Sequence, residues 1–143
     1  MKREVLVSIK GLQYALAEGE DQRVETINRG TFYTRNNKNY VVYEETMSED
    51  AIVKSMLKFD ENYLELSRKG PFSLHMTFEE GKKNYTSYKT PYGDIMIGID
   101  TTAVRCIENE DEINMAVEYD MEVNYEHLAK CRIDMNVKSI KEA

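Results

Sequence analysis

Hydrophobic and polar residues alternate along most of this chain with a period of two. The stretch 72–79 shows the pattern most clearly, because Phe72, Leu74, Met76 and Phe78 are separated by single polar residues. The same alternation continues over 113–123 and over 129–137. Successive side chains of a β-strand point to opposite faces of the sheet. These stretches therefore predict strands that are apolar on one face.

Turn-forming residues divide the alternating runs. Asn36-Asn37-Lys38-Asn39 predicts a tight hairpin turn, because Asn tolerates a positive φ better than most residues. Thr90-Pro91-Tyr92-Gly93 predicts a sharp bend between two strands, because proline has no N–H for a central ladder. We expect Gly30 to separate a strand at 23–28 from another at 31–35.

Two further assignments depend on weaker signals. The apolar row at Ile95, Ile97 and Ile99 is predicted as one strand and 101–108 as the next. Residues 51–59 fit either a helical stripe or a loose alternation, and the hairpin-like Asp60-Glu61-Asn62 that follows favours a strand.

The number of strands predicts the architecture. About ten to twelve short strands, eight to ten of them main ones, are linked by turns short enough for antiparallel neighbours. An open sheet of this size would curl and leave two exposed edges, which closure removes. We therefore expect one all-β domain over residues 1–143, an antiparallel meander closed into a barrel. A two-sheet sandwich is the competing architecture.

Composition limits the partners. The 143 residues are 41% hydrophobic and 31% charged, as in soluble globular proteins. The net charge of −7 argues against nucleic-acid binding, and no apolar run approaches the length of a membrane span. The N-terminal MKREVLVSIKG reads as a strand, not a signal peptide. We expect a cytoplasmic protein in which Cys106 and Cys131 are free thiols.

Three segments resemble the YwiB-like family of small bacterial proteins: Tyr88 to Gly93, Tyr43-Glu44-Glu45, and Glu118 to Asn124. The resemblance covers nearly the whole chain. It implies a calycin-like (lipocalin-like) antiparallel barrel, in agreement with the meander, and it carries over no functional residue. We expect Asn-Gly turns in the family where this chain has Asn37-Lys38 and Asn124-Tyr125. Both turns should survive, with their type left open.

The predicted inward rows are rich in Met, Tyr, Phe and Ile, and the chain has eight methionines. Methionine adapts to irregular apolar shapes, including those of ligands. These side chains either fill the barrel or leave a cup for a small hydrophobic or amphipathic ligand. Both alternatives stay open.

Glu45 is the sharpest candidate for a site. If Val41 and Tyr43 face inward, Glu45 faces inward with them, and a buried carboxylate needs a partner. Arg105, Lys89 and tyrosine hydroxyls are the partners considered. Alternatively, Glu45 lies in water at the barrel mouth, or the facing is shifted by one residue. The candidate ligand-binding residues are Tyr43, Glu45, Tyr88, Tyr92, Arg105 and Tyr119.

Three functions are compatible with these features. The first is binding of a small hydrophobic or amphipathic ligand in the barrel cup. The second is a homodimeric interaction module that uses an apolar patch or a strand edge. The third is a hydrolase or isomerase with Glu45 as acid or base. His75 is placed on an outer face without a partner, and we find no phosphate loop or nucleophile elbow, so no catalytic residue, cofactor or metal is expected.

Overall fold

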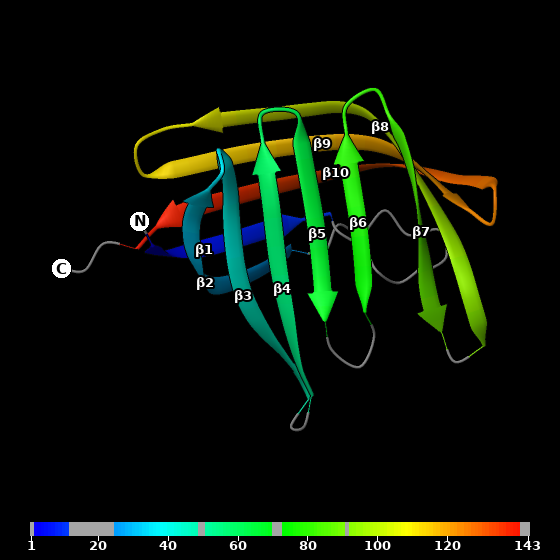
Figure 1. Cartoon of the computed structure of the whole chain (residues 1–143), viewed down its shortest axis with the longest axis horizontal. Coiled ribbons are helices and arrows are strands. Elements are labelled where there is room, and N and C mark those ends of the chain that lie inside the picture. Colours follow the sequence, from blue (N-terminus) through cyan, green and yellow to red (C-terminus); the bar gives the residue numbers. More distant parts are fainter. Residues whose placement is uncertain (1, 12–24, 49–50, 70–72, 91, 141–143) are drawn as a thin grey trace.

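The computed structural model describes residues 2–11, 25–48, 51–69, 73–90 and 92–140. They contain ten β-strands (Figure 1) and no helix with the length and apolar character needed to cross a membrane. The strands are β1 (Arg3–Lys10), β2 (Glu25–Arg35), β3 (Lys38–Ser48), β4 (Ala51–Asp60), β5 (Tyr63–Lys69), β6 (Leu74–Glu79), β7 (Lys83–Thr90), β8 (Gly93–Glu108), β9 (Glu112–Val123) and β10 (Glu126–Ser139).

The strands form a single antiparallel sheet in the order β6-β5-β4-β3-β2-β1-β10-β9-β8-β7. The sheet curls so that β3 to β6 lie across β8 to β10, and its two end strands, β6 and β7, come together near their shared turn (Figure 1). There the Asn84 amide donates to the Thr77 carbonyl over 3.5 Å. Within the described residues no backbone ladder joins β6 to β7. The predicted all-β meander is confirmed as a nearly closed barrel.

Two tight turns have the left-handed backbone that a twisted hairpin needs. Asn36 and Asn37 have φ values of 51° and 64°, and Asn124 and Tyr125 have 50° and 70°. Two successive positive φ values define the type I′ turn, which matches the twist of the flanking strands. The asparagine turn predicted from the sequence is confirmed, and it lies one residue earlier than the Asn37-Lys38 step.

Gly30 does not break a strand, so that prediction was wrong. β2 runs through it without interruption and pairs with both β1 and β3. A Cβ at position 30 would lie 2.8 Å from the Val42 carbonyl oxygen and 3.2 Å from the Tyr43 Cβ. The glycine therefore permits a close approach of β3 within the sheet.

The two strands predicted at 95–99 and 101–108 are one long strand, β8, with a bulge between Thr101 and Ala103. Inward-facing residues fall at Ile97, Ile99 and Thr101 before the bulge, and at Val104 after it. A bulge inserts one extra residue and so reverses the facing of everything beyond it. The ambiguous segment 51–59 is a strand, as predicted.

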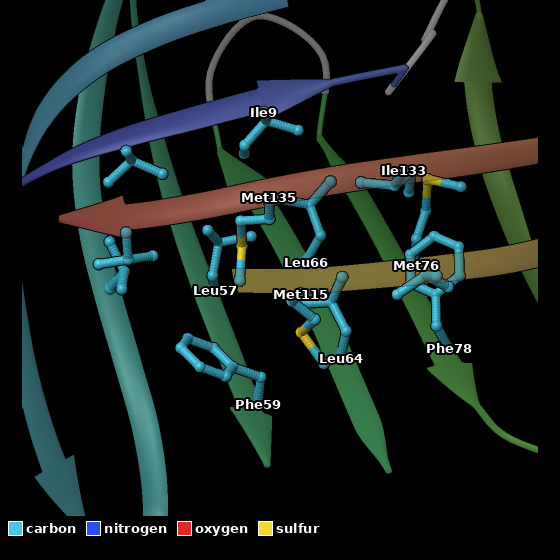
Figure 2. Packing of buried hydrophobic residues seen from close by; sticks show 14 of the residues in the cluster. Ile9, Leu57, Phe59, Leu64, Leu66, Met76, Phe78, Met115, Ile133 and Met135 are labelled. Carbon is cyan, nitrogen blue, oxygen red and sulfur yellow. The ribbon is translucent and has the colours of Figure 1, made fainter. Parts of the chain in front are cut away.

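Apolar side chains from opposite walls fill the barrel interior. Leucines and phenylalanines of β4 to β6 meet methionines and isoleucines of β1, β9 and β10 (Figure 2). Phe59, Phe78, Val41 and Val117 have no exposed surface. The gap between these walls holds only about 10 Å³, hardly enough for one water molecule. The packed interior, one of the two alternatives left open by the sequence, is the one observed here.

Candidate functional site

Polar clusters lie toward both ends of the barrel. The β3–β4, β5–β6 and β9–β10 connections lie at one end, which we call the Glu45 end. The β2–β3, β4–β5 and β8–β9 turns lie at the other, which we call the Asn36 end. This division follows from the uninterrupted antiparallel order of the strands.

Four inward-facing residues form a polar group toward the Glu45 end. Tyr43, Ser55 and Arg68 are aligned across β3, β4 and β5, because Tyr43 pairs with Ser55 and Ser55 pairs with Arg68. Glu45 lies two residues beyond Tyr43, on the same face of β3. We call Tyr43, Glu45, Ser55 and Arg68 the Glu45 cluster.

An ion pair lies at the centre of the Glu45 cluster. Arg68 Nη2 donates to Glu45 Oε2 over 3.2 Å. The side chains are only 9% and 16% exposed, respectively. Removal of two charges from water costs several kcal/mol for each ion, which their attraction must offset. The interior at this end is therefore charged, whereas the buried side chains in the middle of the barrel are uncharged.

The Tyr43 hydroxyl completes the cluster as a neutral group. Burial and, to a smaller extent, the charge of Glu45 raise the pKa of Tyr43 to about 12, while the Ser55 hydroxyl and Arg68 act in the opposite direction. The phenol therefore keeps its proton at neutral pH. In this form it can donate a hydrogen bond but cannot act as a base.

Of the partners considered for Glu45, Arg105 was wrong, and the side chain of Lys89 lies outside the described part of the structure. Arg105 is exposed on the outer face of β8, because the bulge after Thr101 reverses its direction. Arg68, which sequence reasoning missed, takes its place. The signal was present, since Arg68 continues the period-two row of Leu64 and Leu66. The prediction that Glu45 faces inward together with Tyr43 is confirmed.

The remaining tyrosine candidates do not join the Glu45 cluster. Tyr119 is buried in the core, where its ring meets Phe78 edge-on at 4.9 Å between centroids. Tyr92 is fully exposed at the β7–β8 turn. The backbone of Tyr88 pairs with Ile95, and its side chain lies outside the described part of the structure, as does Pro91.

His75 has a partner that its spacing did not reveal. On the outer face of β6, its Nε2 lies 2.7 Å from Glu65 Oε1, and Glu65 also accepts a hydrogen bond from the Tyr63 hydroxyl. Burial acts to raise the pKa of Glu65, but these two hydrogen bonds outweigh it and hold the pKa below its usual value. The network lies on the outside of the barrel, away from the Glu45 cluster.

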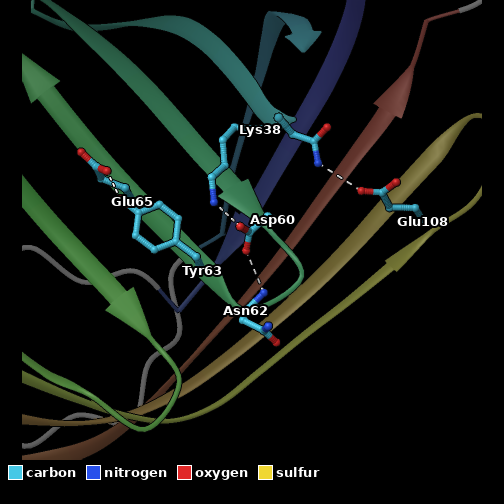
Figure 3. A network of polar contacts seen from close by, with 7 residues as sticks. Lys38, Asp60, Asn62, Tyr63, Glu65 and Glu108 are labelled. Atoms are coloured by element: carbon cyan, nitrogen blue, oxygen red, sulfur yellow. Dashed lines mark hydrogen bonds and ion pairs between the residues drawn. The ribbon is translucent and has the colours of Figure 1, made fainter. Parts of the chain in front are cut away.

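A polar cleft of about 670 Å³ opens at the Asn36 end. Its walls are the β2–β3 and β4–β5 turns and the end of β8, and Figure 3 shows the contacts around it. Asn39 Nδ2 donates to Glu108 Oε1 over 3.1 Å and so connects two strands that are not neighbours in the sheet. Asp60 is held by an ion pair with Lys38 and by the Asn62 N–H at 2.9 Å.

Both cysteines are free and half-buried. Burial, followed by the charges of Glu108, Glu61 and Asp60, raises the pKa of Cys106 to about 11. The Cys106 thiol therefore stays protonated and unreactive at neutral pH. Among the described residues, no group of histidine, cysteine and acidic side chains converges closely enough to hold a metal ion.

The fold and the polar groups at the two ends of the barrel define the class of this protein. It is a small antiparallel barrel protein with a packed apolar middle. Residues 7–135 match the family model described as "Domain of unknown function (DUF1934)", and the chain belongs to that family. It is 25% identical over 130 residues to the uncharacterized beta-barrel protein YwiB of Bacillus subtilis (strain 168), with 90% of this chain and 91% of that protein covered.

The crystal structure of the ywiB protein from Bacillus subtilis has the same fold. It matches with a TM-score of 0.79 and 20% identity, over 98% of this chain and 94% of that one. The resemblance to the YwiB-like family and the barrel architecture are both confirmed.

Proposed function

We propose that the protein binds the polar head of a small amphipathic ligand at the Glu45 cluster. The observation that supports this proposal is the buried Arg68–Glu45 ion pair. Replacement of a buried ion pair by apolar residues is often neutral or stabilising, so folding alone gives little reason to keep one. Charged groups held away from water are more typical of binding and catalytic sites.

The cluster offers complementary groups to a ligand head. A guanidinium presents up to five N–H donors in a planar fork, which suits a carboxylate. The Tyr43 phenol and the Ser55 hydroxyl lie in the same row as Arg68. Glu45 balances the charge of Arg68 when the site is empty, and an anionic head group would compete with it for the guanidinium.

The position of Arg68 supports access from outside. Arg68 pairs with Leu74, the first residue of β6, and β6 is an end strand of the sheet. From their shared turn, β6 and β7 splay apart toward the Glu45 end (Figure 1). The cluster thus lies one strand away from the incomplete part of the barrel wall.

The packed core limits the apolar part of the ligand. Val53 and Leu74 are buried beside the cluster and provide a small apolar surface. The gap of about 10 Å³ in the middle of the barrel leaves no room for a long chain. We therefore propose a short amphipathic molecule and not a long-chain lipid lodged along the barrel axis.

Titration with octanoate and octanol, followed by amide NMR, tests this proposal. We expect the signals of Tyr43, Ser55 and Arg68 to shift. Arg68→Met should abolish octanoate binding, whereas Glu45→Gln should strengthen it because the competing carboxylate is gone. Arg105→Met, a change of an exposed arginine, is the matched control and should leave binding unchanged. If neither probe moves the cluster signals, the proposal is wrong.

Homodimerisation is a second candidate, supported by the edge of β7. β7 ends the sheet, and exposed apolar side chains lie beside it. Tyr85 on β7 and Tyr125 in the β9–β10 turn are 48% and 70% exposed, with ring centroids 5.6 Å apart. An end strand of this kind can pair with its copy across a two-fold axis.

Light scattering after size exclusion tests the dimer. The wild type should be dimeric at micromolar concentration, and Ser87→Pro, which removes a backbone donor from β7, should make it monomeric. The control is Thr31→Ser on β2. A proline such as Thr102→Pro is unsuitable as a control, because β8 is an internal strand and the change would disrupt the sheet itself. A wild type that stays monomeric up to millimolar concentration would exclude this candidate.

A further inference from the structure

The cleft at the Asn36 end has the size of a small-molecule site. Its volume of about 670 Å³ falls within the range of roughly 300–1,000 Å³ that such sites occupy. Phe59, which pairs with Asn39 and has no exposed surface, closes it off from the apolar core. The cleft is therefore separate from the Glu45 cluster at the other end of the barrel.

The lining of the cleft is polar throughout. It consists of four carboxamides, three carboxylates, one guanidinium and one hydroxyl: Asn36, Asn37, Asn39, Asn62, Asp60, Glu61, Glu108, Arg35 and Thr34. Arg35 and Lys38, the latter paired with Asp60, offset two of the three carboxylates. One net negative charge remains, so hydrogen bonding and not charge dominates the chemistry of the cleft.

This lining excludes several classes of ligand. An apolar molecule would meet no apolar side chain, and an anion would meet a net negative charge. Within the described residues the carboxylates do not converge on a point where a single metal ion could bind. A polycation would need more than one net charge to bind tightly at physiological salt.

A ligand rich in hydroxyl groups is compatible with this lining. Hydroxyls both donate and accept, as the mixed lining requires. Carboxamide, carboxylate and guanidinium groups are planar and two-pronged, so each can bond two adjacent hydroxyls at once. The Asn39–Glu108 bond joins opposite walls of the cleft and holds two such groups side by side.

We propose that this cleft is a second binding site and that it takes a small polyhydroxylated ligand, a sugar or a sugar alcohol. The turns that form it are fixed by the left-handed Asn36 and Asn37 and by the Asp60–Asn62 hydrogen bond. The backbones of these turns are thus fixed, and the Asn39 carboxamide is held by Glu108, before a ligand arrives, which reduces the entropy lost on binding.

Amide NMR titration with glucose, sorbitol, spermidine and citrate tests the assignment. Glucose or sorbitol should shift the signals of Asn36, Asn39 and Asn62 and leave those of the Glu45 cluster unmoved. Asn39→Ala should weaken binding by roughly threefold to tenfold, as expected for the loss of one hydrogen bond. Asn62→Ala, in an exposed turn, tests the same site if Asn39→Ala does not fold.

Asn114→Ala is the matched control. Asn114 is exposed on β9 and bonded to Asn136 at 2.8 Å, outside the cleft, so the change should leave sugar binding unaltered. Shifts produced by spermidine or citrate but not by the sugars would overturn the proposal. So would sugar-induced shifts that are small and spread over the whole surface, or the absence of any shift. None of these outcomes bears on octanoate binding at the Glu45 end.

Discussion

The buried Arg68–Glu45 pair should be dispensable for folding only when both partners are replaced together. Arg68→Met leaves Glu45 buried without its cation, and Glu45→Gln leaves Arg68 without its anion. Breaking a buried pair in this way costs about 3–5 kcal/mol. The double replacement Glu45→Leu with Arg68→Met removes both charges, and we expect its stability to lie within about 1 kcal/mol of the wild type.

The magnitude follows from the exposure of the pair. The exposed pair Arg29–Glu4 has the same N–O separation of 3.2 Å, but its side chains are 64% and 59% exposed. Solvent screening reduces such a pair to less than about 1 kcal/mol. Arg29→Met is therefore the control that separates the effect of burial from the effect of pairing.

Urea unfolding is the assay. The chain has no tryptophan and ten tyrosines, so far-UV circular dichroism and tyrosine fluorescence are the probes. A single-site loss of about 3–5 kcal/mol corresponds to a fall in Tm of roughly 10–15 °C for a domain of this size. If the double variant is destabilised as much as either single variant, the pair stabilises the fold and the physical reasoning behind the proposed function fails.

Three further changes have predictable outcomes. Tyr125→Gly should raise the free energy of unfolding by about 0.5–1 kcal/mol, because glycine accepts the φ of 70° without strain, whereas Tyr125→Ala keeps the strain and should give no gain in chemical denaturation. Gly30→Ala should lower it by about 1–3 kcal/mol, because the new Cβ would crowd a backbone oxygen at 2.8 Å; a neutral result would mean that β2 and β3 shift freely. Iodoacetamide should alkylate Cys106 about a hundredfold more slowly at pH 8 than in the unfolded chain, because its pKa is raised from 9.0 to about 11, and Glu108→Gln should speed the reaction. An unchanged rate in that variant would show that the carboxylate does not act on the thiol.

Alternation in the sequence predicts most of the fold because most strands have one buried face. The rows ending at Phe78, Val123 and Val137 are placed on the correct face by period alone. Gly30 misleads, since its role depends on the approach of β3, a partner that a single sequence does not reveal. The bulge after Thr101 misleads for the same reason, because an extra residue has no local signature.

The candidate site, like the fold, could be predicted from the sequence only in part. Glu45 and Tyr43 are correctly predicted to face inward, because they continue an unbroken row from Val41. Arg105 fails because the bulge reverses its facing, and Arg68 is missed although it shares the phase of Leu66. The cleft at the Asn36 end joins β3 to β8, which are far apart in both sequence and sheet order. Only the closure of the barrel brings such residues together.

Native mass spectrometry of the protein isolated from its own cells tests the central claim most directly. The wild type should carry a small molecule of defined mass, and the folded double variant Glu45→Leu with Arg68→Met should lack it. A wild type with no added mass, or a double variant that retains the same molecule, would contradict binding at the Glu45 cluster.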